Sequence, residues 1–273
     1  MSVINTNVKS IMAQNALAVN NRSLSKAMEQ LSTGKRINGA ADDSAGLAIA
    51  SRMQAQIRGL NQGIRNANDA TAMIQTAEGA TKEISNMLER MRELSVQAAN
   101  DTYGTEDRDA IQTEVDQLDE EITRIASNTE WNGKKILGAD KGQYTYQVGS
   151  GSTTTSSVSL TFDAMDSTSL SVDSLDMASF GSAQAAISKL DVAIQTVDTF
   201  RATLGAKINR MASAADNLAN VSMNTAASRS RIEDADYAQA TTELARTQII
   251  QQAATAMLAQ ANQQPQSVLS LLK

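Results

Sequence analysis

The stretch ISKLDVAIQTVDTFRATLGAKINRMASAADNLANVSMNT, residues 187–225, decides the fold class. Mostly apolar or small residues recur in it at alternating steps of three and four, the repeat of a helix that keeps one stripe against partner helices. As a single helix the stretch would be about 58 Å long, at about 1.5 Å per residue. Such a helix needs long partners. The stripe is Ile187, Leu190, Ile194, Val197, Arg201, Leu204, Ile208, Met211, Ala215, Leu218, Ser222 and Thr225.

Two segments of the N-terminal half supply these partners. One begins at Asp42-Asp43-Ser44, which are good N-cap and first-turn residues, and continues to about Ala99. The other begins at Thr105 and has apolar residues at steps of four and three. Together with residues 187–225 they predict a helical bundle. Its predicted seam residues are Ile57, Leu60, Ile64, Ile74, Ile111, Val115, Leu118, Ile122, Ile194, Leu204, Ile208 and Leu218.

Both ends of the chain also have helical patterns. Residues 1–33 predict a helix that ends at Thr33-Gly34-Lys35, although Asn15, Asn20 and Asn21 weaken its apolar seam. After Thr225 we expect a short linker with a break, then a final helix over about 234–262 that Pro265 ends. The apolar stripe of this helix is broader than one partner helix would cover, which indicates burial between molecules.

Residues 131–181 have a different pattern. Residues 143–148 and 157–162 alternate apolar and polar side chains, the period of a half-buried strand, and the loop GSGSTTTSS joins them. The sequence therefore predicts a β-hairpin, with residues 169–172 as a third strand or a loop. The expected fold is mainly α: a long antiparallel coiled-coil or bundle rod with a small β-hairpin region in the middle of the chain.

The composition argues against most catalytic chemistry. There is no Cys and no His among the 273 residues, so thiol nucleophiles, common zinc sites and His-dependent triads are excluded. A net charge of −6 disfavours nucleic acid as a partner, and no stretch predicts a membrane span or an ordinary secretory signal. We expect no enzyme, no cofactor and no metal. Composition alone indicates the cytoplasm.

Three candidate sites have simpler structural interpretations. Asp42 and Asp43 are adjacent at a helix start and do not face each other as a metal pair would. The acidic run Asp116, Asp119, Glu120 and Glu121 is typical of a solvated helix face. The glycines of residues 149–151 lie between strands, where a phosphate cradle is not expected. With no catalytic constellation, two incompletely satisfied terminal helices predict a part for building helical polymers.

Four segments carry a resemblance to a known family. They are INTNVKSIMAQNAL, LSTGKRINGAADDSAGLAIASRM, RMRELSVQAANDT and QANQQPQSVLSLLK. They closely resemble bacterial flagellin, in the family's order and spacing, over roughly residues 1–140 and 183–273. The sequence therefore looks like a short flagellin without large outer domains.

The resemblance implies a function and a domain organisation. The chain would be a structural subunit that polymerises into the flagellar filament for swimming motility. Residues 1–43 and 234–273 would form the two halves of an inner axial domain. Residues 44–181, with two long helices and the hairpin region at about 131–181, would form the second domain together with its C-terminal helix, residues 182–233.

The resemblance also implies a location and partners. Export through the flagellar type III apparatus would place the protein outside the cell, in the filament, which reverses the compositional expectation. Its partners would be further copies of itself, an export chaperone at the C-terminal helix, and the hook-associated and cap proteins. The axial residues expected at subunit interfaces are Ile4, Val8, Ile11, Leu17, Leu24, Leu31, Leu244, Ile249, Ile250, Ala253, Met257 and Leu258.

A further implied partner is the host Toll-like receptor for flagellin. The positions that match the family's receptor contacts are Arg90, Leu94 and Glu114. Glu89 and Met91 depart from the family's usual residues beside them.

Three alternative functions stay open at this point. The chain could be a hook–filament junction adaptor with similar terminal helices, a minor flagellin, or a coiled-coil binding module that does not polymerise. A flagellin with a metalloprotease domain is excluded, because its H-E-x-x-H zinc ligands need histidine.

Overall fold

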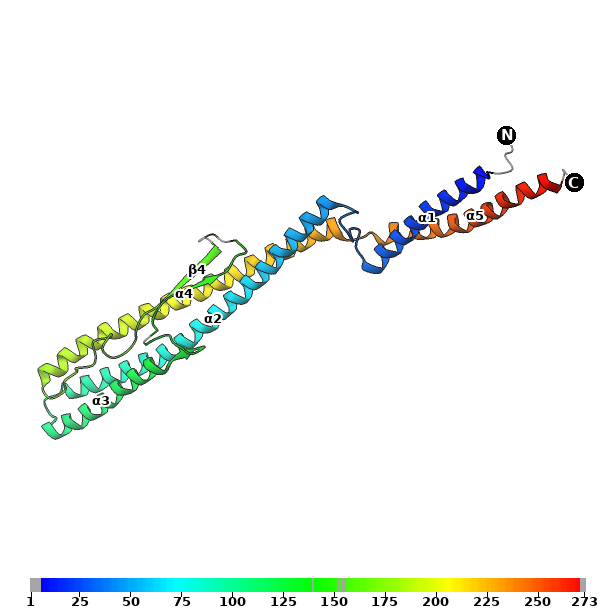
Figure 1. Ribbon diagram of the computed structural model, residues 1–273. Helices are drawn as coiled ribbons and strands as arrows, with labels where there is room; N and C mark the ends of the chain where they lie inside the picture. Colours follow the sequence, from blue (N-terminus) through cyan, green and yellow to red (C-terminus); the bar gives the residue numbers. More distant parts are fainter. Residues whose placement is uncertain (1–5, 139, 152, 154–155, 271–273) are drawn as a thin grey trace. The chain divides into compact units, whose positions relative to one another are not determined.

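The computed structural model describes residues 6–138, 140–151, 153 and 156–270. Within them, five helices account for most of the chain (Figure 1). These are α1 (Val8–Thr33), α2 (Ser44–Ala98), α3 (Thr105–Asn128), α4 (Phe180–Glu233) and α5 (Tyr237–Ser270). The strands are β1 (Glu130–Trp131), β2 (Lys134–Lys135), β3 (Gly142–Gln147) and β4 (Ser157–Phe162). The expectation of a mainly helical chain with a small central hairpin region is confirmed.

The chain divides into two compact units. One unit comprises residues up to Ile57 together with residues from Met223 onward, and the other is Arg58–Ser222. Both boundaries fall inside long helices, since α2 and α4 contribute residues to both units. The division expected from the sequence lies elsewhere, at 43/44 and 233/234, where helices begin and end. The assignment of those segments to an axial and a second domain stays a prediction.

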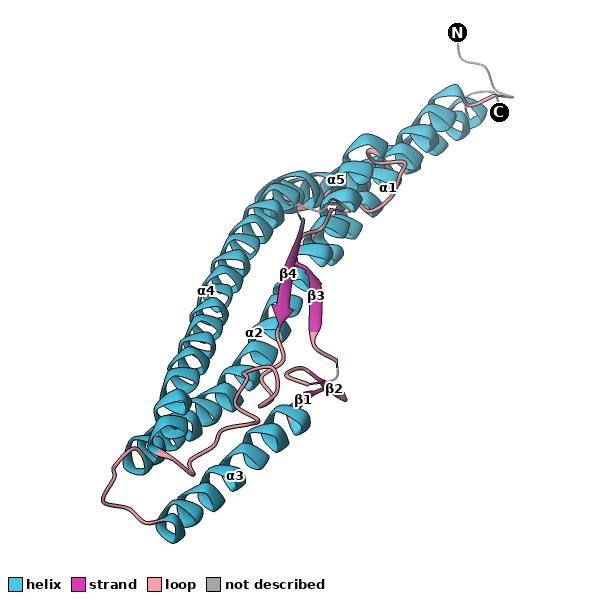
Figure 2. Cartoon of the chain, turned by 90° about the vertical axis from the view of Figure 1, so that its left-hand side faces the viewer, coloured by secondary structure: helices cyan, strands magenta, loops and turns pink. Residues whose placement is uncertain are grey.

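The core of the Arg58–Ser222 unit lies between α2, α3 and α4 and is covered by the hairpin region (Figure 2). Every residue of the 187–225 stripe within this unit is buried or half-buried. The stripe of α4 is widened by a second row of small and aromatic side chains. The buried members of this second row are Ala183, Ala186, Ala193 and Phe200.

The predicted hairpin is confirmed, and the structure adds its register. β3 and β4 are antiparallel, and Gly142 pairs with Phe162 while Gln147 pairs with Ser157. Residues 169–172 form turns and no strand, although Leu170 and Val172 are buried in the core.

A second small hairpin, β1–β2, was missed by the sequence analysis. Its turn residues Asn132 and Gly133 have φ of 50° and 77°. A type I′ hairpin turn requires two positive φ values, and Asn-Gly is its usual sequence. The signal was therefore present in the sequence.

In the other unit, α1 and α5 lie side by side in both views (Figures 1 and 2). α1 ends where the sequence predicts, because Gly34 takes the left-handed conformation (φ 70°) and its N–H donates to the Gln30 carbonyl. The N–H of Ala235 donates to the Gly34 carbonyl at 2.9 Å. Lys35 pairs with Glu233 at 2.5 Å. The loop after α1 is thereby fixed to the α4–α5 junction.

Asp42 and Asp43 have separate structural roles at the start of α2. Asp43 caps the helix by accepting the Gly46 N–H at 2.8 Å. Asp42 instead accepts the N–H groups of Asn38 and Gly39 and pairs with Lys26 at 2.8 Å. The two carboxylates therefore do not form a shared site.

Two helix ends that the periodicity predicted were wrong, whereas the helix 182–233 that the resemblance implies agrees with the end of α4. α4 does not end at Thr225 but continues to Glu233, so the expected linker shrinks to the residues before Tyr237. Residues 226–233 contain neither Gly nor Pro, and nothing in them interrupts a helix. α5 continues through Pro265 to Ser270. A proline costs a helix one backbone hydrogen bond, and in α5 another donor reaches the carbonyl that this leaves free.

Candidate assembly surface on the terminal helices

The paired faces of α1 and α5 join through apolar contact and hydrogen bonds, among which those donated by the Asn20 and Asn7 side chains are the shortest. Asn20 is 7% exposed, and its Nδ2 donates to the Thr247 carbonyl at 2.8 Å. A buried Asn with a partner specifies one register between helices. Asn20 was expected only to weaken this seam, so the sequence analysis missed its role. The predicted interface residues that are half-buried here are Leu17, Leu24, Leu31, Leu244 and Leu258.

The hydrogen bond from Asn7 replaces the backbone hydrogen bond that α5 loses at Pro265. In a regular helix the Ala261 carbonyl accepts from the N–H of residue 265, which proline lacks. Asn7 Nδ2 donates to this carbonyl at 2.8 Å, while Asn7 Oδ1 caps α1 by accepting the Ser10 N–H at 3.1 Å. The Asn7 side chain thus caps the first turn of α1 and also supplies the hydrogen bond that the Ala261 carbonyl of α5 lacks. Together with Asn20 and Thr247, this bond makes the pair antiparallel.

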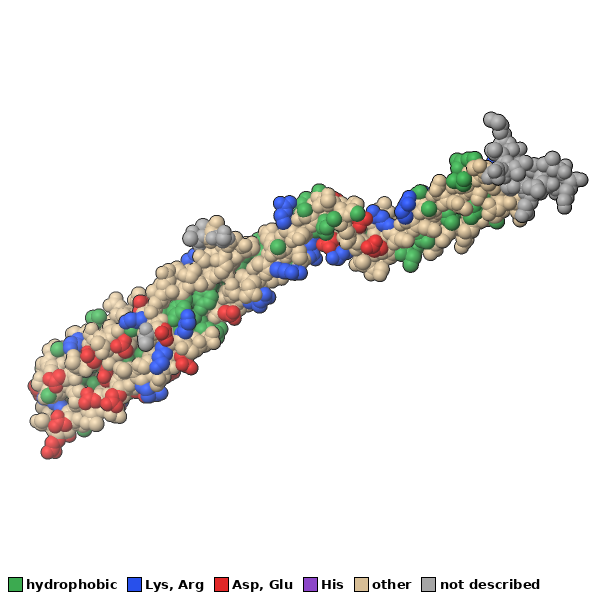
Figure 3. All heavy atoms as spheres, in the orientation of Figure 1, with side chains coloured by type: hydrophobic (Ala, Val, Ile, Leu, Met, Phe, Trp, Pro, Cys, Tyr) green, Lys and Arg blue, Asp and Glu red, His purple; other side chains and the backbone are tan. Residues whose placement is uncertain are grey.

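Each terminal helix has a second apolar stripe that its partner does not cover. In α1 it comprises Val8, Ile11, Met12 and Val19, and in α5 it comprises Ile249, Ile250, Ala253 and Met257. The large side chains among them are 39–67% exposed. We call these the α1 stripe and the α5 stripe. Figure 3 shows hydrophobic side chains at the surface of this pair of helices. Of the predicted interface residues, Ile4 lies outside the described part of the chain.

The predicted seam residues lie in or beside the bundle core, apart from Ile57, which is half-buried in the unit of α1 and α5. The half-buried members of the core are Ile64, Leu118, Ile194 and Ile208. The buried members are Leu60, Ile74, Ile111, Val115, Ile122, Leu204 and Leu218.

The three predicted receptor contacts do not share one surface. The Arg90 guanidinium donates to Glu114 Oε1 at 2.9 and 3.0 Å and pairs with Glu93 at 3.1 Å. The hydrogen bonds to Glu114 raise the pKa of Arg90. Leu94 is 2% exposed, inside the core. Leu94 is thus a core residue, and a direct contact between it and a receptor would require the bundle to open.

The acidic run of α3 was predicted to be a solvated helix face, but some of its members are partly buried. Asp119 is half-buried, and its Oδ1 has no hydrogen-bond partner. Burial raises the pKa of Asp119, with repulsion from Asp173, Asp116 and Glu120 adding to the effect. Among the described residues, no group of three acidic side chains could hold a metal ion.

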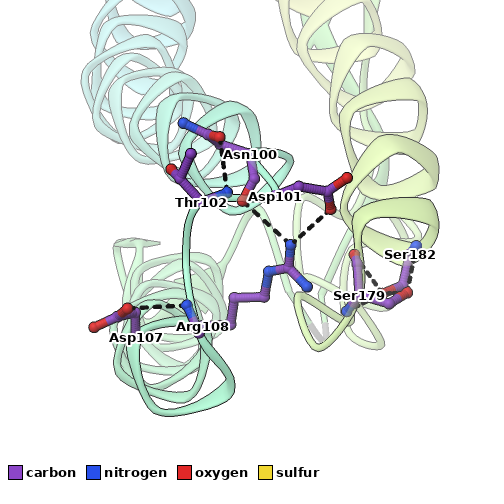
Figure 4. A network of polar contacts seen from close by, with 8 residues as sticks. Asn100, Asp101, Thr102, Asp107, Arg108, Ser179 and Ser182 are labelled. Carbon is purple, nitrogen blue, oxygen red and sulfur yellow. Dashed lines mark hydrogen bonds and ion pairs between the residues drawn. The ribbon is translucent and has the colours of Figure 1, made fainter.

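Polar contacts also fix the turn from α2 to α3 (Figure 4). The Arg108 guanidinium donates to the Asn100 carbonyl at 3.2 Å and reaches Asp101 at 3.4 Å. Asp107 accepts the Gly104 N–H at 3.0 Å and so closes the first turn of α3. At the start of α4, the Ser179 and Ser182 hydroxyls hydrogen-bond to each other at 2.9 Å, and each hydroxyl oxygen accepts the backbone N–H of the other serine. All of these contacts cap helices or hold the turn, so this polar network needs no ligand to explain it.

In the described part of the chain, no helix is long and apolar enough to cross a membrane. The observations together define a class. This is a structural protein of long helices whose terminal pair leaves apolar stripes for further packing.

Comparison with known proteins identifies the family. The family model described as the bacterial flagellin N-terminal helical region matches residues 4–141, and that of the C-terminal helical region matches residues 187–272. A flagellin of Halalkalibacterium halodurans is 44% identical over 271 residues, covering 99% of this chain and all of the relative. A flagellin of Bacillus subtilis is 39% identical over 304 residues, covering 99% of both.

Solved structures agree. The crystal structure of Bacillus cereus flagellin is 35% identical and has a TM-score of 0.50, covering 56% of this chain and 88% of that one. A putative flagellar hook-associated protein from Vibrio parahaemolyticus has a TM-score of 0.60 at 13% identity, covering 71% and 100%, which is a likeness of fold alone.

The chain belongs to the bacterial flagellin family. It is a structural subunit of the flagellar filament and not an enzyme. Nothing in these similarities favours the junction adaptor or the minor flagellin.

Proposed function

We propose that the α1 and α5 stripes are the surfaces through which this flagellin packs against further copies of itself in the filament. The support is their exposure: the α5 stripe has Ile249 and Met257 at 66% exposed each, on a helix whose other face is already covered by α1. Isolated exposed apolar residues are ordinary, but rows of them along one helix face mark an interaction site. In a filament, a neighbouring subunit is the partner that would cover these rows.

The energy available from these stripes is sufficient to drive association. Burial of one Ile or Met side chain stabilises by about 1.5–3 kcal/mol. Each stripe has three large apolar side chains or more. The polar faces between them would stay at the rim, where they contribute less.

The test is seeded polymerisation of the purified full chain, read by electron microscopy and by the critical concentration. Ile249→Ser removes one large apolar side chain from the α5 stripe, and we expect the critical concentration to rise by about tenfold or more. The matched control is Val192→Ser on α4, which removes an equally exposed apolar side chain (63%) outside both stripes. It should polymerise like the unchanged chain.

Circular dichroism should show the same helix content for both variants, because neither side chain is buried. Ile249→Ser filaments with an unchanged critical concentration would contradict the proposal. An equal loss in Val192→Ser would also contradict it.

We also propose the finer assignments that follow from family membership. Export proceeds through the flagellar type III apparatus, with a chaperone on the exposed face of α5 before assembly, and the product works in the extracellular filament. The cap and hook-associated proteins meet the ends of the polymer. If a chaperone uses the α5 stripe, Ile249→Ser weakens chaperone capture in a pull-down, and equal capture of both forms would contradict this.

For the host receptor, the exposed Arg90–Glu114 pair supports a contact, whereas the burial of Leu94 does not. Arg90→Ala should lower the response of receptor-expressing reporter cells to purified monomer. The matched control is Arg92→Ala, which breaks the comparable surface pair with Asp191 (2.6 Å). A silent wild-type monomer at high dose would end this assignment.

A further inference from the structure

The methionine side chains of the described residues range from buried to exposed, with Met53 and Met87 half-buried between the two extremes. There are twelve methionines and no cysteine, so methionine is the only site for sulfur oxidation. Five methionines are at most 2% exposed in the core: Met73, Met91, Met165, Met177 and Met211. Four others are 57–68% exposed: Met12, Met28, Met223 and Met257. An oxidant in solution therefore meets the second group before the first.

Only two of the four exposed methionines lie in the apolar stripes. Met12 belongs to the α1 stripe, one turn after Val8, and Met257 belongs to the α5 stripe, one turn after Ala253. Met28 is on α1 but about 160° around the helix from Met12, at about 100° per residue. Met223 is on α4 and so belongs to neither stripe.

The two stripe methionines also lie at one level of the helix pair. The hydrogen bonds from Asn20 to Thr247 and from Asn7 to Ala261 fix an antiparallel register. Moving along α1 from Asn7 to Met12 corresponds to moving back along α5 from Ala261 to beside Met257. Oxidation of these two neighbouring methionines would thus alter both stripes at the same level of the helix pair.

We infer that Met12 and Met257 form an oxidation-sensitive site that controls self-assembly. The inference rests on the proposed packing of the stripes. A thioether is polarizable and apolar and adapts to an irregular partner surface, whereas a sulfoxide is polar. A sulfoxide buried at a subunit contact would lose its water without a designed hydrogen-bond partner. Oxidised subunits are therefore excluded from the growing polymer, and the reduced form assembles.

The oxidant is a peroxide. The methionine sulfur attacks one oxygen of hydrogen peroxide, so an S–O bond forms and the O–O bond breaks. The sulfur loses two electrons, and the departing hydroxide takes up the proton of the oxygen that is now bound to sulfur, which leaves the sulfoxide and water. Methionine sulfoxide reductases reverse the step, which makes the site a switch.

The experiment compares seeded polymerisation before and after hydrogen peroxide, with peptide mass mapping of every methionine. We expect Met12 and Met257 to be converted while Met73 and Met91 remain thioethers, and the critical concentration to rise by about tenfold or more. The double variant Met12→Leu, Met257→Leu should polymerise equally with and without peroxide. The matched control Met28→Leu, Met223→Leu should lose polymerisation on oxidation like the unchanged chain.

A second measurement uses the unchanged chain alone. Treating oxidised protein with both methionine sulfoxide reductases should restore its critical concentration. Unaltered polymerisation of a chain with Met12 and Met257 fully oxidised would overturn the inference. An undiminished peroxide effect in the Met12→Leu, Met257→Leu variant would do the same. Neither result would alter the outcome of Ile249→Ser, so failure of the switch is distinct from failure of the proposed packing.

Discussion

Single polar side chains fix the geometry of the terminal helices. Asn20 lies among apolar seam residues and costs desolvation, but its amide donates to a buried carbonyl, and Thr247 itself is 2% exposed. A polar group with one satisfied partner tolerates no shift of the helices along each other, whereas leucines tolerate several registers. Asn7 reinforces the same register at the other end of the contact.

The first prediction concerns this amide. Asn20→Ala should lower the free energy of unfolding of the α1–α5 pair by about 1–2 kcal/mol, because a buried hydrogen bond and some packing are lost. Hydrogen exchange of the α1 amides measures the change. Asn15→Ala, at an exposed position of the same helix, is the control and should change little. Equal exchange rates in the two variants would show that Asn20 does not hold the pair.

The second prediction concerns pH and Asp119. Burial raises the pKa of Asp119 in the folded state above its ordinary value of 3.8. The folded chain therefore holds this proton more tightly than the unfolded chain. The resulting stability is present below pH 3.8 and is lost as the pH rises through the folded-state pKa. At neutral pH the charged carboxylate destabilises the fold.

Asp119→Asn should accordingly raise the thermal midpoint at pH 7, and its advantage should disappear near pH 3.5, below the ordinary carboxyl pKa of about 3.9. Thermal unfolding followed by circular dichroism at both pH values is the measurement. Asp109→Asn removes an exposed charge from the same helix and controls for net charge. A variant with no advantage at pH 7 would refute the pH dependence.

At the scale of elements, the glycines of α2 decide where the hairpin can approach. A Cβ on Gly63 would lie 3.1 Å from the Val148 carbonyl carbon and 3.2 Å from Leu218 Cδ1. The sequence analysis did not foresee this contact with the hairpin. Asn66 Nδ2 donates to the Gln147 carbonyl at 2.8 Å and holds the hairpin against α2 beside Gly63. Gly79 has no atom within 4 Å of such a Cβ.

The third prediction compares these two glycines. Gly79→Ala should stabilise by about 1 kcal/mol through helix propensity. Gly63→Ala should destabilise by about 1–3 kcal/mol, because backbone and a core side chain must move apart. Denaturant unfolding of the two variants gives the comparison within one helix. A stabilised Gly63→Ala would mean that the hairpin does not pack closely there.

At the scale of the whole molecule, the chain divides into two compact units, and the proposed assembly stripes both lie in the unit that contains α1 and α5. The Arg58–Ser222 unit has its own core of α2, α3, α4 and the hairpin. The other unit pairs the two ends of the chain, so α1 is covered on one face only by α5. Loss of α5 therefore uncovers the paired face of α1 as well as removing the α5 stripe.

The fourth prediction follows from this division. Truncation of residues 240–273 should abolish seeded polymerisation. It should leave slow hydrogen exchange in the core around Leu88, Ile122 and Val197, because these side chains pack within the Arg58–Ser222 unit. Filaments formed by the truncated chain would contradict the assignment of assembly to the terminal helices. General loss of protection would contradict the independence of the core.

The sequence by itself determined the features that depend on local periodicity. The 3.5-residue repeat of residues 187–225, the alternation of 143–148 and 157–162, and the Gly34 stop all follow from short-range geometry, and each has its counterpart in the structure. The Asn132-Gly133 turn could have been predicted in the same way.

Only the tertiary structure decided which side chains meet across the chain. Asn20 places a polar group in an apolar seam, and Pro265 leaves a helix carbonyl without its donor. In each case a hydrogen bond to a residue more than 200 positions away in the sequence compensates for this cost. Leu94 and Arg90 are neighbours on one helix, but packing buries the first and leaves the second at the surface. Periodicity fixes the apolar face of a helix, whereas the extent to which a partner covers that face depends on packing between distant segments.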